Sequence, residues 1–280
     1  MLYGIKINIM LIGMKFYFEY LGFKVENMSD NGFVKSEINN GVGKIEFYHP
    51  KSNSLPSDLL SQLANSINEF GLNPEVKVIL LSSAGDKAFC AGASFDELLK
   101  LKTETEGEKF FNGFGNVILA IKNAEKFVVV KVHGKTVGGG VGIVCSADYV
   151  IATESASVKL SELFIGIGPF VIGAAVKRKI GLANFSSLAI NSSQWKNSKW
   201  AKLNGMYNEV VLDESELDLR TSNLLEELVT YSPEAMLRTK EMFWEGAEDL
   251  ESFMKDKAKQ SGTLVLSEFT KEKLNSFKSK

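Results

Sequence analysis

Residues 132–148, VHGKTVGGGVGIVCSAD, carry the most information about the fold. They continue an apolar strand pattern (FVVVKVHG, 127–134), pass through the glycine triplet 138–140, and become an apolar helix pattern through Val144. Glycine lets a ligand approach the main chain, and the N–H groups that begin a helix favour negative charge. The stretch therefore predicts a site for an anion or an oxyanion. A turn that merely packs tightly explains the same glycines equally well.

Strand and helix patterns alternate around this stretch. GKIEFY (43–48), VKVILLSS (76–83) and DYVIAT (148–153) are typical of strands, whereas residues 56–71 place apolar side chains at helical spacing. Repeated strand–helix units predict a layered α/β fold.

The chain divides into three parts by pattern. Residues 1–27 form an apolar N-terminal extension of uncertain status, interrupted by charges and lacking the features of a signal peptide. Residues 28–212 form the α/β core, and residues 213–280 form a C-terminal helical region with three predicted helical segments. Pro233 is expected in the first turn of one of them.

Composition excludes several classes of function. The 280 residues carry a formal net charge of −2, so a nucleic acid or an anionic membrane surface is not the expected partner. The two cysteines are far apart and form no metal-binding pattern, which favours a reducing compartment, and we expect a cytoplasmic protein without metal. No apolar run reaches the roughly 18 residues of a membrane span.

A second segment of small residues precedes another predicted helix. GDKAFCAGASFDELLKL (85–101) places Ala91, Gly92 and Ala93 before a helical run that begins near Ser94. Taken alone, this segment is better explained as a loop packed against the core than as a site.

The two segments together resemble the signature pair of the crotonase, or enoyl-CoA hydratase/isomerase, superfamily: AFCAGAS (88–94), then HGKTVGGGVGI (133–143). The resemblance covers roughly residues 30–280. It implies a ββα spiral core with a C-terminal helical region, assembled as a homotrimer or a dimer of trimers. It also implies that the backbone amides of Ala93 and Gly139 bind the thioester oxygen of an acyl-CoA substrate, with no further cofactor. Such amides stabilise the negative charge of an enolate.

Glu162 is the candidate for proton transfer. It lies among apolar residues in SVKLSELFIGIGPF (157–170), where a carboxyl should have a raised pKa. A solvent-facing glutamate at a strand end is the alternative from the residues alone. The resemblance favours catalysis, because Glu162 falls at a catalytic glutamate of the family.

Gly142 departs from the family pattern, because many hydratases have a second glutamate there. The glycines and residues 160–181 look most like a methylglutaconyl-CoA hydratase-like branch, which favours hydration or dehydration. A double-bond isomerase that uses one carboxylate is the first alternative. The second is an acyl-CoA-binding or assembly protein without catalysis.

The remaining candidates are weaker. The resemblance implies contacts with coenzyme A at residues 51–54, the carbonyl of Ala91 and basic residues of the tail, and the expected contact positions are Lys51, Ser54, Ala91, Lys271 and Lys273. Core packing is an equal explanation for the possible acyl-pocket residues, which are Ser161, Phe164, Phe170 and Val171. We expect structural or surface roles for His49 and His133, structural roles for Cys90 and Asp148, and early-helix charges at Asp96 and Glu97.

Overall fold

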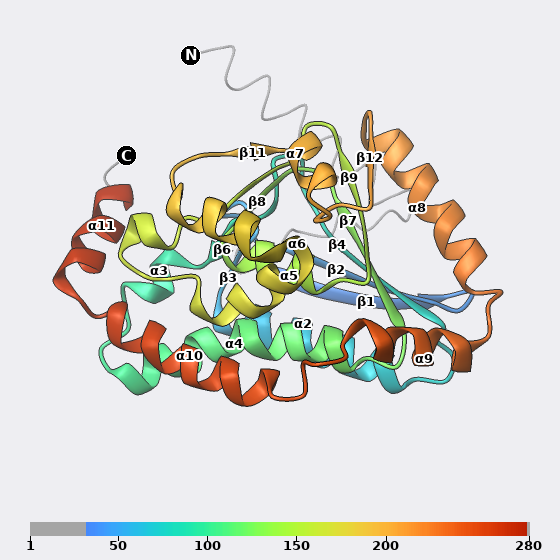
Figure 1. The fold of residues 1–280 in the computed structure, drawn as a ribbon, viewed down its shortest axis with the longest axis horizontal. Coiled ribbons are helices and arrows are strands. Elements are labelled where there is room, and N and C mark those ends of the chain that lie inside the picture. The colour runs from blue at the N-terminus through green and yellow to red at the C-terminus, as the bar shows by residue number, and fades with distance from the viewer. Residues whose placement is uncertain (1–31, 279–280) are drawn as a thin grey trace, which may run out of the picture. The chain divides into compact units, whose positions relative to one another are not determined.

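The computed structural model describes residues 32–278 (Figure 1). The predicted extension 1–27 therefore lies outside the described residues. From residue 32 onward the chain forms one compact unit of mixed strands and helices.

A six-stranded sheet forms the base of the fold, in the order β1-β2-β4-β7-β9-β12. Strands β1 and β2 are antiparallel, and every later neighbour in this sheet is parallel. The strands are β1 (Phe33–Asn39), β2 (Val42–Tyr48), β4 (Val78–Ser83), β7 (Phe127–Val132), β9 (Tyr149–Thr153) and β12 (Glu209–Val211). The three strands expected from the sequence are β2, β4 and β9, and the strand pattern before the glycine triplet is β7.

Both faces of this sheet are covered, because successive side chains of a strand point to opposite faces. In β4, Ile79 and Leu81 join the large core, whereas Val78 and Leu80 join a smaller cluster. The large core contains buried residues of α2 (Ser57–Leu72), α4 (Glu104–Asn123), α5 (Gly139–Ser146), α6 (Phe170–Ile190) and α10 (Leu250–Leu264). The smaller cluster contains Leu225 and Leu228 of α8 (Glu214–Leu228).

A second sheet of four short strands carries the segments of interest, in the order β11-β10-β8-β5. Strands β5, β8 and β10 are mutually parallel, so their carboxyl ends meet at one edge. The strands are β5 (Ala88–Cys90), β8 (Lys135–Val137), β10 (Ser157–Lys159) and β11 (Lys196–Asn197). Beside them, β3 (Ser54–Leu55) pairs with β6 (Gly92–Ala93), and the short helix α3 (Phe95–Leu98) follows.

After residue 213 the described residues contain four helices, whereas the sequence pattern predicted three segments: α8, α9 (Pro233–Phe243), α10 and α11 (Glu268–Lys278). The extra boundary follows Leu264, where Ser267 accepts a hydrogen bond from the Thr270 N–H at 3.3 Å and begins a new helix. Pro233 occupies the first turn of α9, as expected. Helix α7 (Ser198–Leu203) precedes this region.

A buried ion pair fixes α9 to the sheet. Lys240 Nζ lies 2.9 Å from Asp148 Oδ2, and the two side chains are 3% and 4% exposed. Lys240 also donates to the Lys126 carbonyl at 2.8 Å, and Asp148 accepts from the Val128 N–H at 2.7 Å. Burial raises the pKa of Asp148 and lowers that of Lys240, while each partner opposes the shift of the other. The expected structural role of Asp148 is confirmed.

Candidate active site

The candidate site lies at the carboxyl edge of the four-stranded sheet. Residues 91–93 follow β5, Gly138 and Gly139 follow β8, and Glu162 comes shortly after β10. Because these three strands are parallel neighbours, chain segments separated by tens of residues come together at their ends. The Gly138 N–H donates to the Lys159 carbonyl at 2.9 Å and joins two of the segments.

The two glycine-containing segments are in close contact through their backbones. Gly92 has φ of +81°, and a Cβ atom placed on it would lie 2.8 Å from the Val137 carbonyl oxygen and 3.4 Å from the Gly139 nitrogen. A side chain at Gly92 would therefore separate Ala93 from Gly139. Gly139 is the first residue of α5, and the first amides of a helix have no acceptor within it.

The carboxyl group of Glu162 is buried against Gly138. A Cβ atom on Gly138 would lie 3.0 Å from Glu162 Oε1, and Oε2 is buried with no hydrogen-bond partner in the described residues. Burial raises the pKa of Glu162 from 4.5 to about 7. A carboxyl with a pKa near neutrality can both accept and return a proton.

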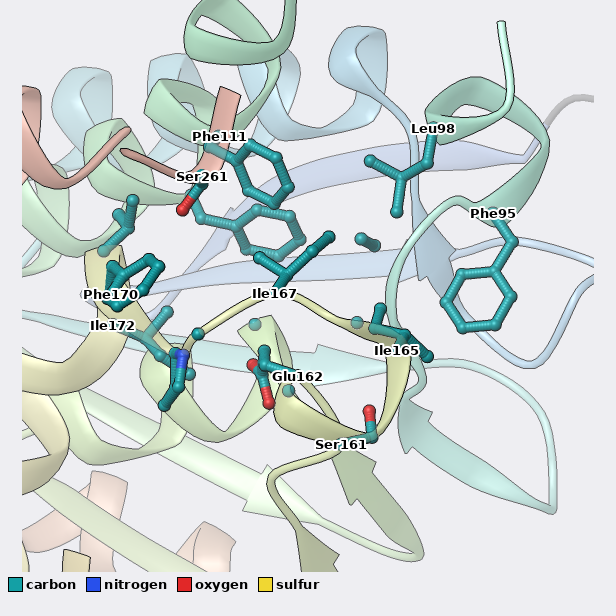
Figure 2. A pocket seen from close by; sticks show the side chains of 18 of the residues that line it. Phe95, Leu98, Phe111, Ser161, Glu162, Ile165, Ile167, Phe170, Ile172 and Ser261 are labelled. Carbon is teal, nitrogen blue, oxygen red and sulfur yellow. The ribbon is translucent and has the colours of Figure 1, made fainter. Parts of the chain in front are cut away.

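A small pocket of about 50 Å³ connects these groups, with Glu162, Ala93 and Gly139 in its wall. Figure 2 shows Glu162 between Phe170 and Ile172 on one side and Phe95 and Leu98 on the other. Of the lining residues, all within the described part of the chain, Glu162 is the one titratable side chain. Ser161 and Ser261 provide hydroxyl groups.

Gly142 has no room for a side chain. A Cβ atom there would lie 2.5 Å from Cγ2 of Ile172, which comes from the neighbouring helix α6. Ile172 also lines the pocket. The space beside α5 is therefore filled by an apolar group where the family resemblance leads one to expect a second carboxylate.

The positions expected to contact coenzyme A fall into two groups, and residues 51–54 and Ala91 form the first, joined through the backbone. Ala91 lines the pocket, and its N–H donates to the Ser52 carbonyl at 3.1 Å. Lys51 forms an ion pair with Asp96. Ser54 is buried, and its hydroxyl lies 3.1 Å from Nδ1 of His49.

The other two positions lie on α11. Lys273 lies over the ring of Phe164, with 5.0 Å between Nζ and the ring centroid. Lys271 lines a separate groove with Glu97 of α3, residues 99–102 and Glu106 of α4. Phe277 contacts both Phe95 and Phe164, which brings α11 next to the pocket wall.

Other expectations have mixed outcomes. Ser161, Phe170 and Val171 line the pocket, but Phe164 does not, because its ring is 42% exposed and contacts α11. Cys90 is a buried packing residue, and burial raises the pKa of its thiol to about 12. Glu97 accepts from the N–H of Ser57 at 2.8 Å and thus caps α2, a tertiary role that its own helix does not predict.

Sequence reasoning missed several residues of the site, including Phe111, Phe114, Ile172 and Ser261. Phe114 and Ile172 occupy the space that side chains at Gly139 and Gly142 would need. Gly139 and Gly142 were the available signal, because a glycine in a helix next to a site often indicates that a neighbouring group packs closely against the backbone.

Comparison with known proteins identifies the family. The sequence pattern of the enoyl-CoA hydratase/isomerase family matches residues 37–279. The chain belongs to this family of enzymes. The enoyl-CoA hydratase from Bacillus halodurans has the same fold, with a TM-score of 0.80 at 22% identity over 87% of this chain and 99% of that one. The expected crotonase fold is confirmed.

Two relatives show how broad the enoyl-CoA hydratase/isomerase family is. The short-chain-enoyl-CoA hydratase of Clostridium acetobutylicum is 28% identical over 84% of this chain and 90% of its own length. The peroxisomal Delta(3,5)-Delta(2,4)-dienoyl-CoA isomerase of Arabidopsis thaliana is 27% identical over 67% and 71%, respectively. The methylglutaconyl-CoA hydratase-like branch stays a prediction.

Two further features concern residues 32–278. No group of three or more His, Cys, Asp and Glu side chains in that range is arranged to hold a metal ion. No helix in the same range is both long enough and apolar enough to cross a bilayer.

Proposed function

We propose that this protein catalyses the reversible addition of water to a 2-enoyl-CoA thioester. The observation that carries the proposal is the buried carboxyl of Glu162, whose pKa is about 7, in a small apolar pocket. Ala93 and Gly139, whose amides are the proposed donors, belong to the same pocket wall. A single proton-transfer group beside two backbone donors suits chemistry at the carbon next to a thioester carbonyl.

The proposed reaction uses Glu162 in both proton transfers. Ionised Glu162 takes a proton from water, the water oxygen bonds to C3, and the electrons of the double bond move onto the thioester oxygen. The amides of Ala93 and Gly139 hold the resulting enolate. Glu162 then returns the proton to C2, which regenerates the carboxylate and the carbonyl. Loss of one such donor typically costs about 3 kcal/mol of transition-state stabilisation.

Resemblance to the Clostridium acetobutylicum hydratase supports hydration as the reaction and a short acyl chain as the substrate. 3-Methylglutaconyl-CoA is a further substrate to test. For the coenzyme A portion we propose contacts at Lys51, Ser54, Ala91, Lys271 and Lys273. Lys51 pairs with Asp96, and Asp96 directly follows Phe95, which lines the pocket. A homotrimer or a dimer of trimers is the proposed assembly.

Double-bond isomerisation is the second candidate, and the contact between Gly142 and Ile172 favours it. Because Ile172 fills the space beside Gly142, water would have to be oriented without a second carboxylate there. An isomerase needs one group that removes a proton from C2 of a 3-enoyl thioester and returns it to C4, and Glu162 could serve alone.

Incubation in ¹⁸O-labelled water distinguishes the candidates. The purified protein is supplied separately with 2-enoyl and 3-enoyl thioesters, 3-methylglutaconyl-CoA included, and the products are resolved by mass. Labelled 3-hydroxyacyl product supports the hydratase, whereas migration of the double bond without label supports the isomerase. Tight thioester binding without any turnover would contradict both and favour a non-catalytic acyl-CoA-binding protein.

A further inference from the structure

A second cavity begins where the Glu162 pocket ends. It measures about 640 Å³ and lies between α6, α10 and the segment that precedes α10. Pro169 and Phe170 line both cavities. Phe170 therefore stands at the junction between the candidate active site and a much larger space, which we call the α6–α10 groove.

The groove runs along one face of α6 and one face of α10. On α10, Phe253 and Lys257 line the groove, and Ser261, one further turn along, lines the Glu162 pocket. Residues four apart lie on the same face of a helix, so one face of α10 runs along both cavities. From Phe170 to Arg178, α6 extends about 12 Å along the groove at its usual rise per residue.

The walls of the groove suit a flexible apolar chain. Small residues on α6, Gly173 and Ala174, leave space along one side, and Phe185 and Leu250 add apolar surface. Two of the three cations that line the groove lie over aromatic rings: Arg178 is 4.1 Å from the centroid of Trp244, and Lys257 is 5.2 Å from that of Phe253. Lys177, Glu245 and Asp249 add charged groups to the lining.

The direction of a bound thioester follows from the arrangement of the pocket. Lys51 pairs with Asp96, next to Phe95, and Lys273 lies over Phe164, whose ring contacts Phe277. The cations proposed for coenzyme A are therefore on the Phe95 side. Phe170 is on the other side of Glu162 (Figure 2), so an acyl tail that leaves the Ala93 and Gly139 amides would run toward Phe170.

The ring of Phe170 is held in place by Gly168. A Cβ atom on Gly168 would lie 2.3 Å from Cζ of Phe170, so the ring rests directly on the glycine. The space in front of the ring is small: the pocket measures about 50 Å³, whereas a cavity known to bind benzene measures about 150 Å³.

We propose that Phe170 sets the acyl-chain length of this enzyme by separating the short acyl pocket from the α6–α10 groove, which would accept the tail of a longer fatty acyl-CoA once the ring is removed. Phe170 is thus a specificity-determining residue. This inference rests on the proposed function for the orientation of the thioester, but its test does not require turnover.

The test compares equilibrium binding of butyryl-CoA and dodecanoyl-CoA to the wild-type protein and to Phe170→Ala. Each methylene that leaves water is worth roughly fourfold in binding, so two seated methylenes change the affinity ratio by about fifteenfold. We expect Phe170→Ala to shift the ratio at least about tenfold toward dodecanoyl-CoA.

Two further variants make the test specific. Phe253→Ala removes a phenylalanine from the groove without opening the junction and should leave the wild-type ratio unchanged. Phe170→Ala/Ala174→Trp fills the opened groove and should lose the shift toward dodecanoyl-CoA. A folded Phe170→Ala protein with the wild-type affinity ratio would overturn the inference, as would an equal shift in Phe253→Ala.

Turnover of 2-butenoyl-CoA and 2-dodecenoyl-CoA by the same variants separates the two proposals. A shifted binding ratio without turnover of any thioester would sustain the role of Phe170 and contradict the proposed function. Turnover of 2-butenoyl-CoA with an unchanged binding ratio would sustain the function and overturn the role of Phe170.

Discussion

Gly138 and Glu162 are in such close contact that a methyl group on the glycine would lie 3.0 Å from the carboxylate oxygen Oε1. Gly138 also has φ of +53°, which residues with a side chain rarely adopt. The same glycine thus provides the turn that leads into α5 and the space in which the carboxyl group lies.

Replacing Gly138 by alanine should lower kcat/KM at least about 100-fold, because misplacement of a reacting group by about 1 Å costs that much. The measurement is steady-state kinetics on folded protein. Gly205→Ala is the matched control: Gly205 also has positive φ, but the nearest atom to an added Cβ is 3.6 Å away. Equal losses of activity in the two variants would point to backbone strain alone.

Glu162→Gln should be more stable than the wild-type protein at pH 8 and similar to it at pH 5. Because burial raises the pKa of Glu162 from 4.5 to about 7, the folded protein binds this proton more tightly than the unfolded chain does. The stabilisation that protonated Glu162 contributes to the fold is fully present below pH 4.5 and is lost as the pH rises to about 7. The loss amounts to about 3 kcal/mol.

Urea unfolding of both proteins at the two pH values measures this difference. Glu154→Gln, a substitution of an exposed glutamate, serves as the control and should change stability equally at both. A stability difference between Glu162→Gln and wild type that does not depend on pH would contradict the raised pKa.

The rate of hydration should depend on the same ionisation. Glu162 must be ionised to take a proton from water, so kcat/KM should fall about tenfold per pH unit below the pKa of about 7 and level off above it. A profile of kcat/KM for 2-butenoyl-CoA from pH 5 to 9 tests this. A flat profile between pH 5 and 7 would assign proton transfer to another group.

Gly142→Ala should destabilise the fold by about 1–3 kcal/mol, the usual cost of overpacking a core. The added Cβ would lie 2.5 Å from Cγ2 of Ile172 and 2.7 Å from its Cβ. Ile172→Gly removes both atoms, so the double variant should lose less stability than the two single losses together. A double-mutant cycle of unfolding free energies measures this coupling. Additive losses would show that contact with Ile172 does not cause the cost of Gly142→Ala.

Lys240→Met should cost about 3–5 kcal/mol of unfolding free energy, because it leaves the Asp148 carboxylate buried without its cation. Lys255→Met removes an exposed ion pair with Glu251 and should cost less than about 1 kcal/mol. Urea unfolding of the two variants provides the comparison, and losses of the same size would contradict a special role for the buried pair.

Much of the fold follows from local pattern. The apolar runs of β4 and β7 and the amphipathic face of α2 are evident in the sequence because each depends on residues close together in the chain. The break between α10 and α11 was missed, since Val265 continues the apolar pattern and a serine cap alone gives a weak signal.

The site was less predictable than the fold. The resemblance predicted site roles for Ala93, Gly139 and Glu162, and the parallel pairing of β5, β8 and β10 explains why these three residues share one pocket. No local pattern relates Gly142 to Ile172, because that contact depends on how two helices pack. The same reason hid the position of Phe170 between two cavities.

The contact between Gly142 and Ile172 also limits how this lineage can change. A glutamate introduced at 142 would meet Ile172 with its first side-chain carbon, before its carboxyl group could reach the pocket. A carboxylate at 142 would therefore be accommodated better with a smaller residue at 172, and that smaller residue alone would leave unfilled space in the core. Positions 142 and 172 should therefore show epistasis, because each change alone costs stability and the two together cost less.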